Sequence, residues 1–207
     1  MLHFIRALVD NPASNIKAGD VIVARRFKPM ANAPDITIIT TRHDVEVCLP
    51  SDQMEVFYRV FVYGTLMRGY GNHRLLERAR FISPAMTRRE FSLYSLGAFP
   101  AAVRLVEGDP DAISIRGEVY EVDAQTLVRL DQLEGVSHGF YNRTVHQLHS
   151  WTQRLPVFMY TMSEPRGQLL DRGDWRTARI AERWFATQVP ADDENESAES
   201  AQKELRW

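Results

Sequence analysis

The sequence predicts an α+β protein: a small, mostly antiparallel β-sheet or β-barrel with flanking helices, preceded by a β-rich N-terminal extension. Extended apolar runs recur along most of the 207 residues and are separated by turn-forming residues. Helical patterns are few and do not alternate with the extended runs, as they would in a parallel βαβ sheet. The chain is long enough for one good-sized core and an appendage.

The chain divides into three parts. Residues 1–55 are expected to form the β-rich extension, whose role the sequence does not predict. Its extended segments span residues 20–27, 35–40 and 44–49. Residues 56–189 are expected to form the main domain. Residues 190–207 are acidic and nearly free of apolar side chains, which predicts a disordered tail or a frayed helix.

Extended runs dominate the main domain. The expected strands span residues 59–64, 87–95, 101–106, 113–122, 141–149 and 155–162. A short helix is expected at residues 72–80, with Asn72 as its N-cap, and a last helix at residues 173–189, with Asp174 near its start and Ile180, Trp184 and Val189 along one side.

The clearest helix covers residues 123–135. Asp123 is the expected N-cap and Gly135 the expected stop. The apolar face is expected to consist of Leu127, Leu130 and Leu133.

Composition argues against several classes of function. The formal net charge is −2, so there is no basic field to attract nucleic acid or an anionic membrane. The single cysteine, Cys48, excludes an internal disulfide framework and a multi-thiolate metal site. His146 and His149 are three residues apart and would point to opposite faces of a strand, so no metal is expected. With no signal peptide or membrane-spanning run, we expect a soluble cytoplasmic protein.

The stretch "FVYGTLMRGYGNH" at residues 61–73 ends a strand in a glycine-containing loop. It lacks the Gly-Lys-Ser/Thr of a Walker loop and the G-x-G-x-x-G spacing of a dinucleotide site. What remains is a strand end with consecutive N–H donors at residues 64, 65 and 66, which suits a carboxylate or a developing oxyanion. A glycine turn that closes a hairpin is the alternative.

Glu134 falls at the C-terminal end of the expected helix, where the helix dipole is negative. Its apolar neighbours make partial burial plausible, and both effects raise the pKa of a carboxyl group. Such a group suits a general base that later returns its proton near neutral pH. The alternatives are that Glu134 is exposed, or that it pairs with Arg143 or Arg129.

Six motifs follow one another in order: "VFVYGTLMRGYGNHRLL", "RGEVYEV", "LDQLEG", "FYNRTV", "VFMYT" and "GDWR". The ordered set resembles the gamma-glutamylcyclotransferase-like family, nearest its gamma-glutamylamine cyclotransferase branch, over about residues 56–176. The resemblance implies a small antiparallel barrel with flanking helices. It says nothing about the first 55 residues.

The resemblance also implies roles for individual residues. Glu134 would be the catalytic acid and base. The residues implied to bind or line the substrate site are Tyr63, Gly64, Thr65, Leu66, Tyr141 and Tyr160, and Arg143 matches an arginine with a structural role.

The function expected from the resemblance is cyclisation of a γ-glutamyl amine or γ-glutamyl amino acid to 5-oxoproline, with release of the amine. The α-amine of the substrate attacks its own γ-carbonyl, so no cofactor is needed. The loops near residues 95–100 and 135–140 shape the leaving-amine side, and the sequence does not identify that amine or the oligomeric state. The alternatives are a catalytically silent binding module, and an interaction protein that acts through the N-terminal extension.

Overall fold

The computed structural model describes residues 2–149 and 156–178, which form two sheets and one complete α-helix, besides the helical residues 175–178. The first sheet has nine strands, and the second consists of β12, β7 and β8. The strands are β1 (His3–Ala7), β2 (Val21–Met30), β3 (Ala33–Thr41), β4 (Glu46–Pro50), β5 (Met54–Val62), β6 (Arg80–Met86), β7 (Phe91–Ser95), β8 (Pro100–Arg104), β9 (Arg116–Val122), β10 (Asn142–His146), β11 (Val157–Thr161) and β12 (Gln168–Leu170). The α-helix is α1 (Ala124–Leu133), and the 3₁₀ helices are η1 (Pro12–Ser14), η2 (Ser51–Gln53), η3 (Gly71–Leu76) and η4 (Val136–His138).

Nearly all ladders between these strands are antiparallel, and the exception is the parallel pair of β5 and β11. The predicted α+β class with a mostly antiparallel sheet is therefore confirmed. The ladders of the described strands do not form a closed ring, so the barrel is not confirmed. A single bridge between Thr87 and Leu148 connects the chain just after β6 to the chain just after β10.

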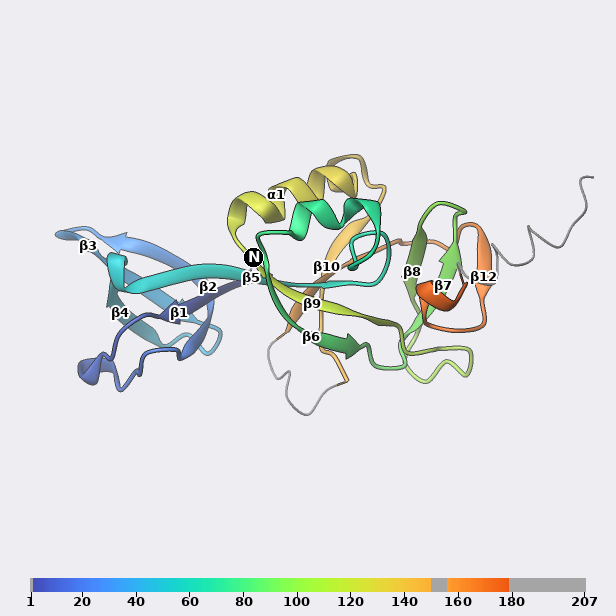
Figure 1. Cartoon of the computed structure of the whole chain (residues 1–207). Coiled ribbons are helices and arrows are strands. Elements are labelled where there is room, and N and C mark those ends of the chain that lie inside the picture. The colour runs from blue at the N-terminus through green and yellow to red at the C-terminus, as the bar shows by residue number, and fades with distance from the viewer. Residues whose placement is uncertain (1, 150–155, 179–207) are drawn as a thin grey trace, which may run out of the picture.

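β5 runs through both halves of the molecule (Figure 1). Its first residues pair with β1, as Phe57 does with Phe4, and its last residues pair with β9 and β11, as Val60 does with Tyr120 and Phe158. The strands of residues 1–55 therefore continue the same sheet, whose order is β10-β11-β5-β1-β2-β3-β4. They also enclose a small core of their own, made of Ile5, Ala7, Ala24, Ile39 and Leu49.

α1 lies over the central strands (Figure 1) and has the expected ends. The Asp123 carboxylate accepts the Thr126 N–H at 2.6 Å, and Gly135 follows the helix with a φ of 62°. Leu127 and Leu130 are buried, as predicted. Leu133, the third residue of the expected apolar face, is 42% exposed, so it does not pack in the core with the other two. It lies instead at the rim of a pocket described below.

The region after the glycine loop differs from the prediction. Residues 72–80 do not form an α-helix: the 3₁₀ helix η3 is followed by the edge strand β6, which contains Pro84. Asn72 is not an N-cap, because its side chain donates to the Thr65 hydroxyl at 3.0 Å. Pro84 is tolerated because β6 pairs with β9 alone.

Three further strand predictions need correction. β1 and β12 were not predicted, although Phe4 and Ile5 of β1 are buried. The expected strand at 87–95 begins only at Phe91, after a bend at Arg89. Of the last expected helix, residues 175–178 are helical and Trp175 is buried; Ile180, Trp184, Val189 and the tail lie outside the described residues.

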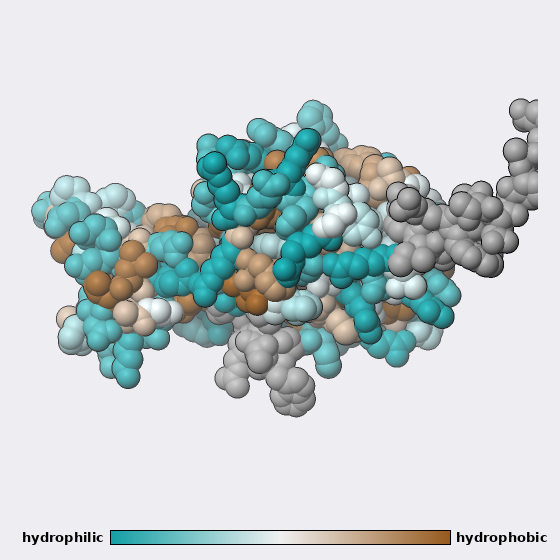
Figure 2. Space-filling view, in the orientation of Figure 1, coloured by the Kyte–Doolittle hydropathy of each residue, from teal (hydrophilic) through white to brown (hydrophobic). Residues whose placement is uncertain are grey.

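The face of the molecule in Figure 2 is mainly hydrophilic over α1, with smaller hydrophobic patches on the N-terminal strands. In the described part of the chain, no helix has the length and apolar character needed to span a membrane. Nor do three metal-ligating side chains come together anywhere within residues 2–149 and 156–178. His146 is buried and its ring lies 2.7 Å from the Thr144 hydroxyl.

Candidate active site

A pocket of about 180 Å³ opens where β5 ends and α1 ends. It brings together all seven residues proposed for catalysis or substrate binding, although they come from distant parts of the sequence. Arg143 does not line it. The lining residues are Phe61, Val62, Tyr63, Gly64, Thr65, Leu66, Asn72, Phe99, Pro100, Leu133, Glu134, Phe140, Tyr141 and Tyr160.

The glycine loop forms one wall of the pocket. A Cβ on Gly64 would lie 2.7 Å from the Pro100 ring, so only glycine fits there without a shift. Among the described residues, no group accepts a hydrogen bond from the N–H of Gly64, Thr65 or Leu66. Because these three donors are unused and line the pocket, they are available to an anionic group of a ligand.

Hydrogen bonds from neighbouring residues hold the loop in place without using its N–H groups at residues 64–66. The Met67 N–H donates to the Gly64 carbonyl at 3.0 Å, and the His73 ring lies 3.0 Å from the Leu66 carbonyl. The Asn72 side chain adds its bond to Thr65. The side chain of Leu66 packs in the core, so only its backbone is available to a ligand.

Glu118, from the G-E-V-Y motif, fixes the far side of the loop. Its buried carboxylate accepts the Arg68 N–H at 3.0 Å and the Tyr120 hydroxyl at 2.8 Å, and it pairs with Arg176 of the "GDWR" motif. Burial raises the pKa of Glu118, but the hydrogen bonds from these three residues outweigh it, and the net shift is downward. The "RGEVYEV" and "GDWR" motifs therefore hold the glycine loop in position and do not line the pocket.

Tyr63 forms the floor of the pocket. Its hydroxyl donates to the Tyr160 carbonyl at 2.8 Å and accepts the Ala102 N–H at 3.0 Å, which connects β11 with β8. Burial raises the pKa of Tyr63 well above its ordinary value, so it stays a neutral phenol. Its hydroxyl is thus committed to the protein, and its ring shapes the pocket.

Glu134 is the C-cap residue of α1 and is half-buried. Its carboxyl group has no hydrogen bond or ion pair with any residue that the structure describes. Burial raises the pKa of Glu134 to about 7. The alternative that Glu134 pairs with Arg143 is wrong, because Arg143 pairs with Asp131 at 2.5 Å. The alternative with Arg129 is also wrong, since no ion pair joins the two side chains.

Asp131 is a site residue that sequence reasoning missed. It accepts the Tyr160 hydroxyl at 2.8 Å and the Arg143 guanidinium through its other oxygen. It precedes Glu134 by three residues, which places both on one side of α1. The three-residue spacing of Asp131 and Glu134 in "LDQLEG" could have suggested a shared role. The sequence did not show that Asp131 would contact residues of β10 and β11.

The hydroxyl groups of Tyr141 and Tyr160 donate their protons to the protein, so they can only accept hydrogen bonds from a ligand. The Tyr160 proton goes to Asp131, and the Tyr141 hydroxyl donates to the Pro100 carbonyl at 2.7 Å. Burial raises the pKa of both phenols, so neither ionises near neutral pH. Each phenolic oxygen can then accept, but not donate, a further hydrogen bond.

The pocket therefore has two unlike walls. The loop contributes three backbone donors to the lining, and Glu134, Tyr141 and Tyr160 contribute a carboxyl group and two phenolic oxygens as acceptors. At the mouth, the rings of Phe99 and Phe140 meet edge-to-face with centroids 6.1 Å apart. Such a pocket fits a small molecule with an anionic and an ammonium group, and it places a near-neutral carboxyl group beside them.

Known proteins have sequences similar to that of the main domain. Residues 60–177 match the family model described as "Gamma-glutamyl cyclotransferase, AIG2-like". A Vibrio cholerae protein named "Putative gamma-glutamylcyclotransferase" is 38% identical over 118 residues, which cover 56% of this chain and 93% of that protein.

Two solved structures extend the comparison to the fold. An uncharacterized protein from Pyrococcus horikoshii, 27% identical, superposes with a TM-score of 0.50 over 61% of this chain and 97% of its own. An allophanate hydrolase from Kluyveromyces lactis, 17% identical, superposes with a TM-score of 0.51 over 83% of this chain and 26% of its own. At this identity the likeness shows a similar fold and nothing about activity. The match of the family model to more than half of the sequence establishes that the chain belongs to the gamma-glutamyl cyclotransferase, AIG2-like family.

Proposed function

We propose that this protein converts a γ-glutamyl amine or a γ-glutamyl amino acid to 5-oxoproline and the free amine, with Glu134 as general acid and base. The observation that carries the proposal is the Glu134 carboxyl group: it lines the pocket, has no partner among the described residues, and has a pKa of about 7. A carboxyl group that titrates near neutral pH can both take and return a proton there.

The two walls suggest how the substrate lies. The N–H groups of residues 64–66 hold the α-carboxylate or the developing oxyanion, and Glu134 with the Tyr160 oxygen faces the α-ammonium. This orientation folds the glutamyl chain so that its nitrogen approaches its own γ-carbonyl. Well-oriented intramolecular reactions can gain roughly 7–11 kcal/mol from such positioning.

The chemistry then balances without a cofactor. Glu134 takes one proton from the α-ammonium, and the amine forms a bond to the γ-carbonyl carbon while the π electrons move to oxygen. Collapse of this intermediate breaks the amide C–N bond as Glu134 returns its proton to the leaving nitrogen. The second proton of the attacking nitrogen passes to the released amine through solvent.

The residues at the rim of the pocket would contact the leaving amine. Phe99, Leu133 and Phe140 surround the side next to Glu134, which is where a leaving amine would lie in this pose. Leu133 and Phe140 are 42% and 40% exposed, so a leaving group that covers them removes apolar surface from water.

The test is release of 5-oxoproline, measured by mass spectrometry, from a panel of γ-glutamyl amides. The panel contains γ-glutamyl-ε-lysine, γ-glutamyl-alanine, γ-glutamyl-putrescine and glutathione. Turnover of at least one member supports the proposal, and the preferred member defines the leaving amine. A folded protein that releases 5-oxoproline from none of them favours the alternative of a silent binding module.

A further inference from the structure

A second hollow lies at the opposite end of α1 from Glu134, where the N-terminal strands meet the main domain. Its volume is about 640 Å³, which is within the range of about 300–1,000 Å³ typical of small-molecule sites. We refer to it as the arginine hollow. Its lining residues are Arg6, Glu55, Val56, Phe57, Arg74, Leu75, Glu77, Arg78, Ala79, Arg80, Glu121, Val122, Asp123, Gln125, Thr126 and Arg129.

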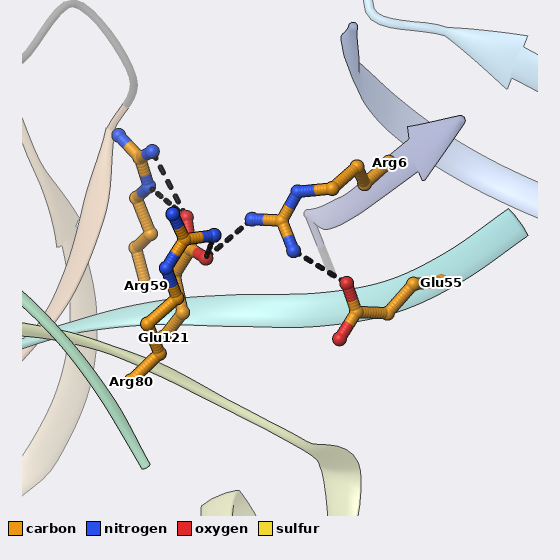
Figure 3. A network of polar contacts seen from close by, with 5 residues as sticks. All are labelled: Arg6, Glu55, Arg59, Arg80 and Glu121. Atoms are coloured by element: carbon orange, nitrogen blue, oxygen red, sulfur yellow. Dashed lines mark hydrogen bonds and ion pairs between the residues drawn. The ribbon is translucent and has the colours of Figure 1, made fainter. Parts of the chain in front are cut away.

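The floor of the arginine hollow is a network around one buried carboxylate (Figure 3). Glu121 of β9 is paired with Arg6 of β1, with Arg59 of β5 at 3.0 Å and with Arg80 of β6 at 3.5 Å. Arg6 also reaches Glu55. Three guanidinium groups thus share two carboxylates, and the floor carries a surplus of positive charge.

The walls add more arginines than acids. Arg74 and Arg78 form no ion pair with any carboxylate in the described part of the chain. Arg129 also forms none, although Asp123 feels its charge: the Thr126 backbone N–H, and then Arg129, lower the pKa of Asp123. Asp123 is itself engaged as the N-cap of α1.

The lining of the hollow has five arginines and four carboxylates, a surplus of one positive charge, and Arg59, which pairs with Glu121 without lining the hollow, adds one more. This local surplus lies in a chain whose formal net charge is −2. The whole-chain charge therefore gave no signal of it.

The arginines converge from separate segments instead of lying along one exposed face. Arg6 comes from β1, Arg74 from η3, Arg80 from β6 and Arg129 from α1. Between them lie apolar residues: Val56, Phe57, Leu75, Ala79 and Val122. The exposed lining of the hollow is mainly polar, so a ligand would be held chiefly by charge-assisted hydrogen bonds from the guanidinium groups.

We propose that the arginine hollow binds a small polyanion that carries two or more phosphate or carboxylate groups. A guanidinium group offers paired N–H donors that match both kinds of oxyanion. Arg74, Arg78 and Arg129 supply the donors, and the network around Glu121 supplies a fixed positive floor. Because β1 and β5 build part of this site, it gives residues 1–55 a role as one wall of a ligand site.

Isothermal titration calorimetry of the full chain with pyrophosphate and, separately, with citrate tests the proposal. We expect one ligand to bind per chain, more weakly as salt is added. Preference for pyrophosphate or for citrate distinguishes a phosphate ligand from a carboxylate ligand. The assay measures no turnover, so its result is independent of the proposed cyclotransferase activity.

The matched variants locate the site. R74Q and R129Q each keep the aliphatic stem and remove one exposed charge, and each should weaken binding about tenfold or more. R88Q makes the same charge change at an exposed arginine outside the hollow and should leave affinity unchanged. The proposal is overturned if neither anion binds the wild-type chain, or if R74Q and R129Q bind like R88Q.

Discussion

The Tyr160 hydroxyl donates a hydrogen bond to Asp131 at 2.8 Å, one turn of α1 before Glu134. The other oxygen of Asp131 is held by Arg143. This pair fixes the direction of the Tyr160 proton, so that the phenolic oxygen presents only acceptor capacity to the pocket. Asp131 thereby positions a pocket residue without lining the pocket itself.

The D131N variant tests this positioning. The neutral amide cannot hold both the Arg143 charge and the Tyr160 proton as the carboxylate does, so Tyr160 loses its fixed direction. We expect kcat/KM to fall by about 10- to 100-fold, the range for loss of a charge-assisted hydrogen bond. D111N, at an exposed aspartate outside the pocket, is the control and should match wild type. Equal kcat/KM in D131N and D111N would refute a positioning role.

Burial of Glu134 also has a consequence for stability. Its folded pKa of about 7 is raised from an ordinary 4.5, so the folded state favours the protonated carboxyl group. The contribution of Glu134 to the free energy of unfolding should therefore be fully present below pH 4.5. It should be lost as the pH rises through 7. Gln does not titrate, so E134Q should gain thermal stability over wild type at pH 8 and little at pH 5.

Thermal melts of both proteins at the two pH values measure this difference. E90Q, at a carboxylate outside the pocket, controls for the loss of one charge. A stability gain in E134Q that is the same at pH 5 and pH 8 would show that Glu134 is not buried enough to titrate near 7.

Gly64 tests the packing of the loop wall. In G64A the new methyl group would lie 2.7 Å from the Pro100 ring, so the loop or the proline must move. We expect a loss of about 1–3 kcal/mol in the free energy of unfolding, together with weaker substrate binding. G71A adds the same methyl group where nothing lies within 4 Å, and it should be close to neutral. Urea unfolding of the two variants compares them directly.

The network at the base of the N-terminal strands predicts a second stability difference. Glu121 has a side chain only 5% exposed and is shared by three arginines, so E121Q removes the one carboxylate charge common to all three, although Arg6 keeps Glu55. We expect a loss of about 3–5 kcal/mol in the free energy of unfolding. E55Q removes the more exposed partner of Arg6 and should cost less than about 1 kcal/mol. Similar losses in both variants would contradict a central role for Glu121.

Local patterns predicted the parts of the fold that depend on neighbours in sequence. Asp123 and Gly135 bound α1 as expected, since capping is a local interaction. The edge strand β6 was missed because its Pro84 and the helix-like residues before it argue for another structure, and only pairing with β9 makes it a strand. The continuity of the sheet through β5 was likewise not visible in the sequence.

The candidate site also has residues that local motifs predicted and residues that only the folded chain brings together. The motifs identified Glu134 and the loop of residues 63–66, because each carries its own local chemistry. Asp131 was not identified, since its role depends on Tyr160 and Arg143, which α1 meets only in the folded chain. The arginine hollow was hidden for the same reason: its arginines are dispersed in sequence and converge in space.

The most direct test of the central claim compares wild type with E134Q, using the best γ-glutamyl amide of the panel. We expect E134Q to form no 5-oxoproline detectable by mass spectrometry, while calorimetry shows that it still binds the substrate. Loss of turnover with binding retained assigns the proton transfers to Glu134. Full turnover in a folded E134Q protein would contradict the assignment and would require another acid and base in the pocket.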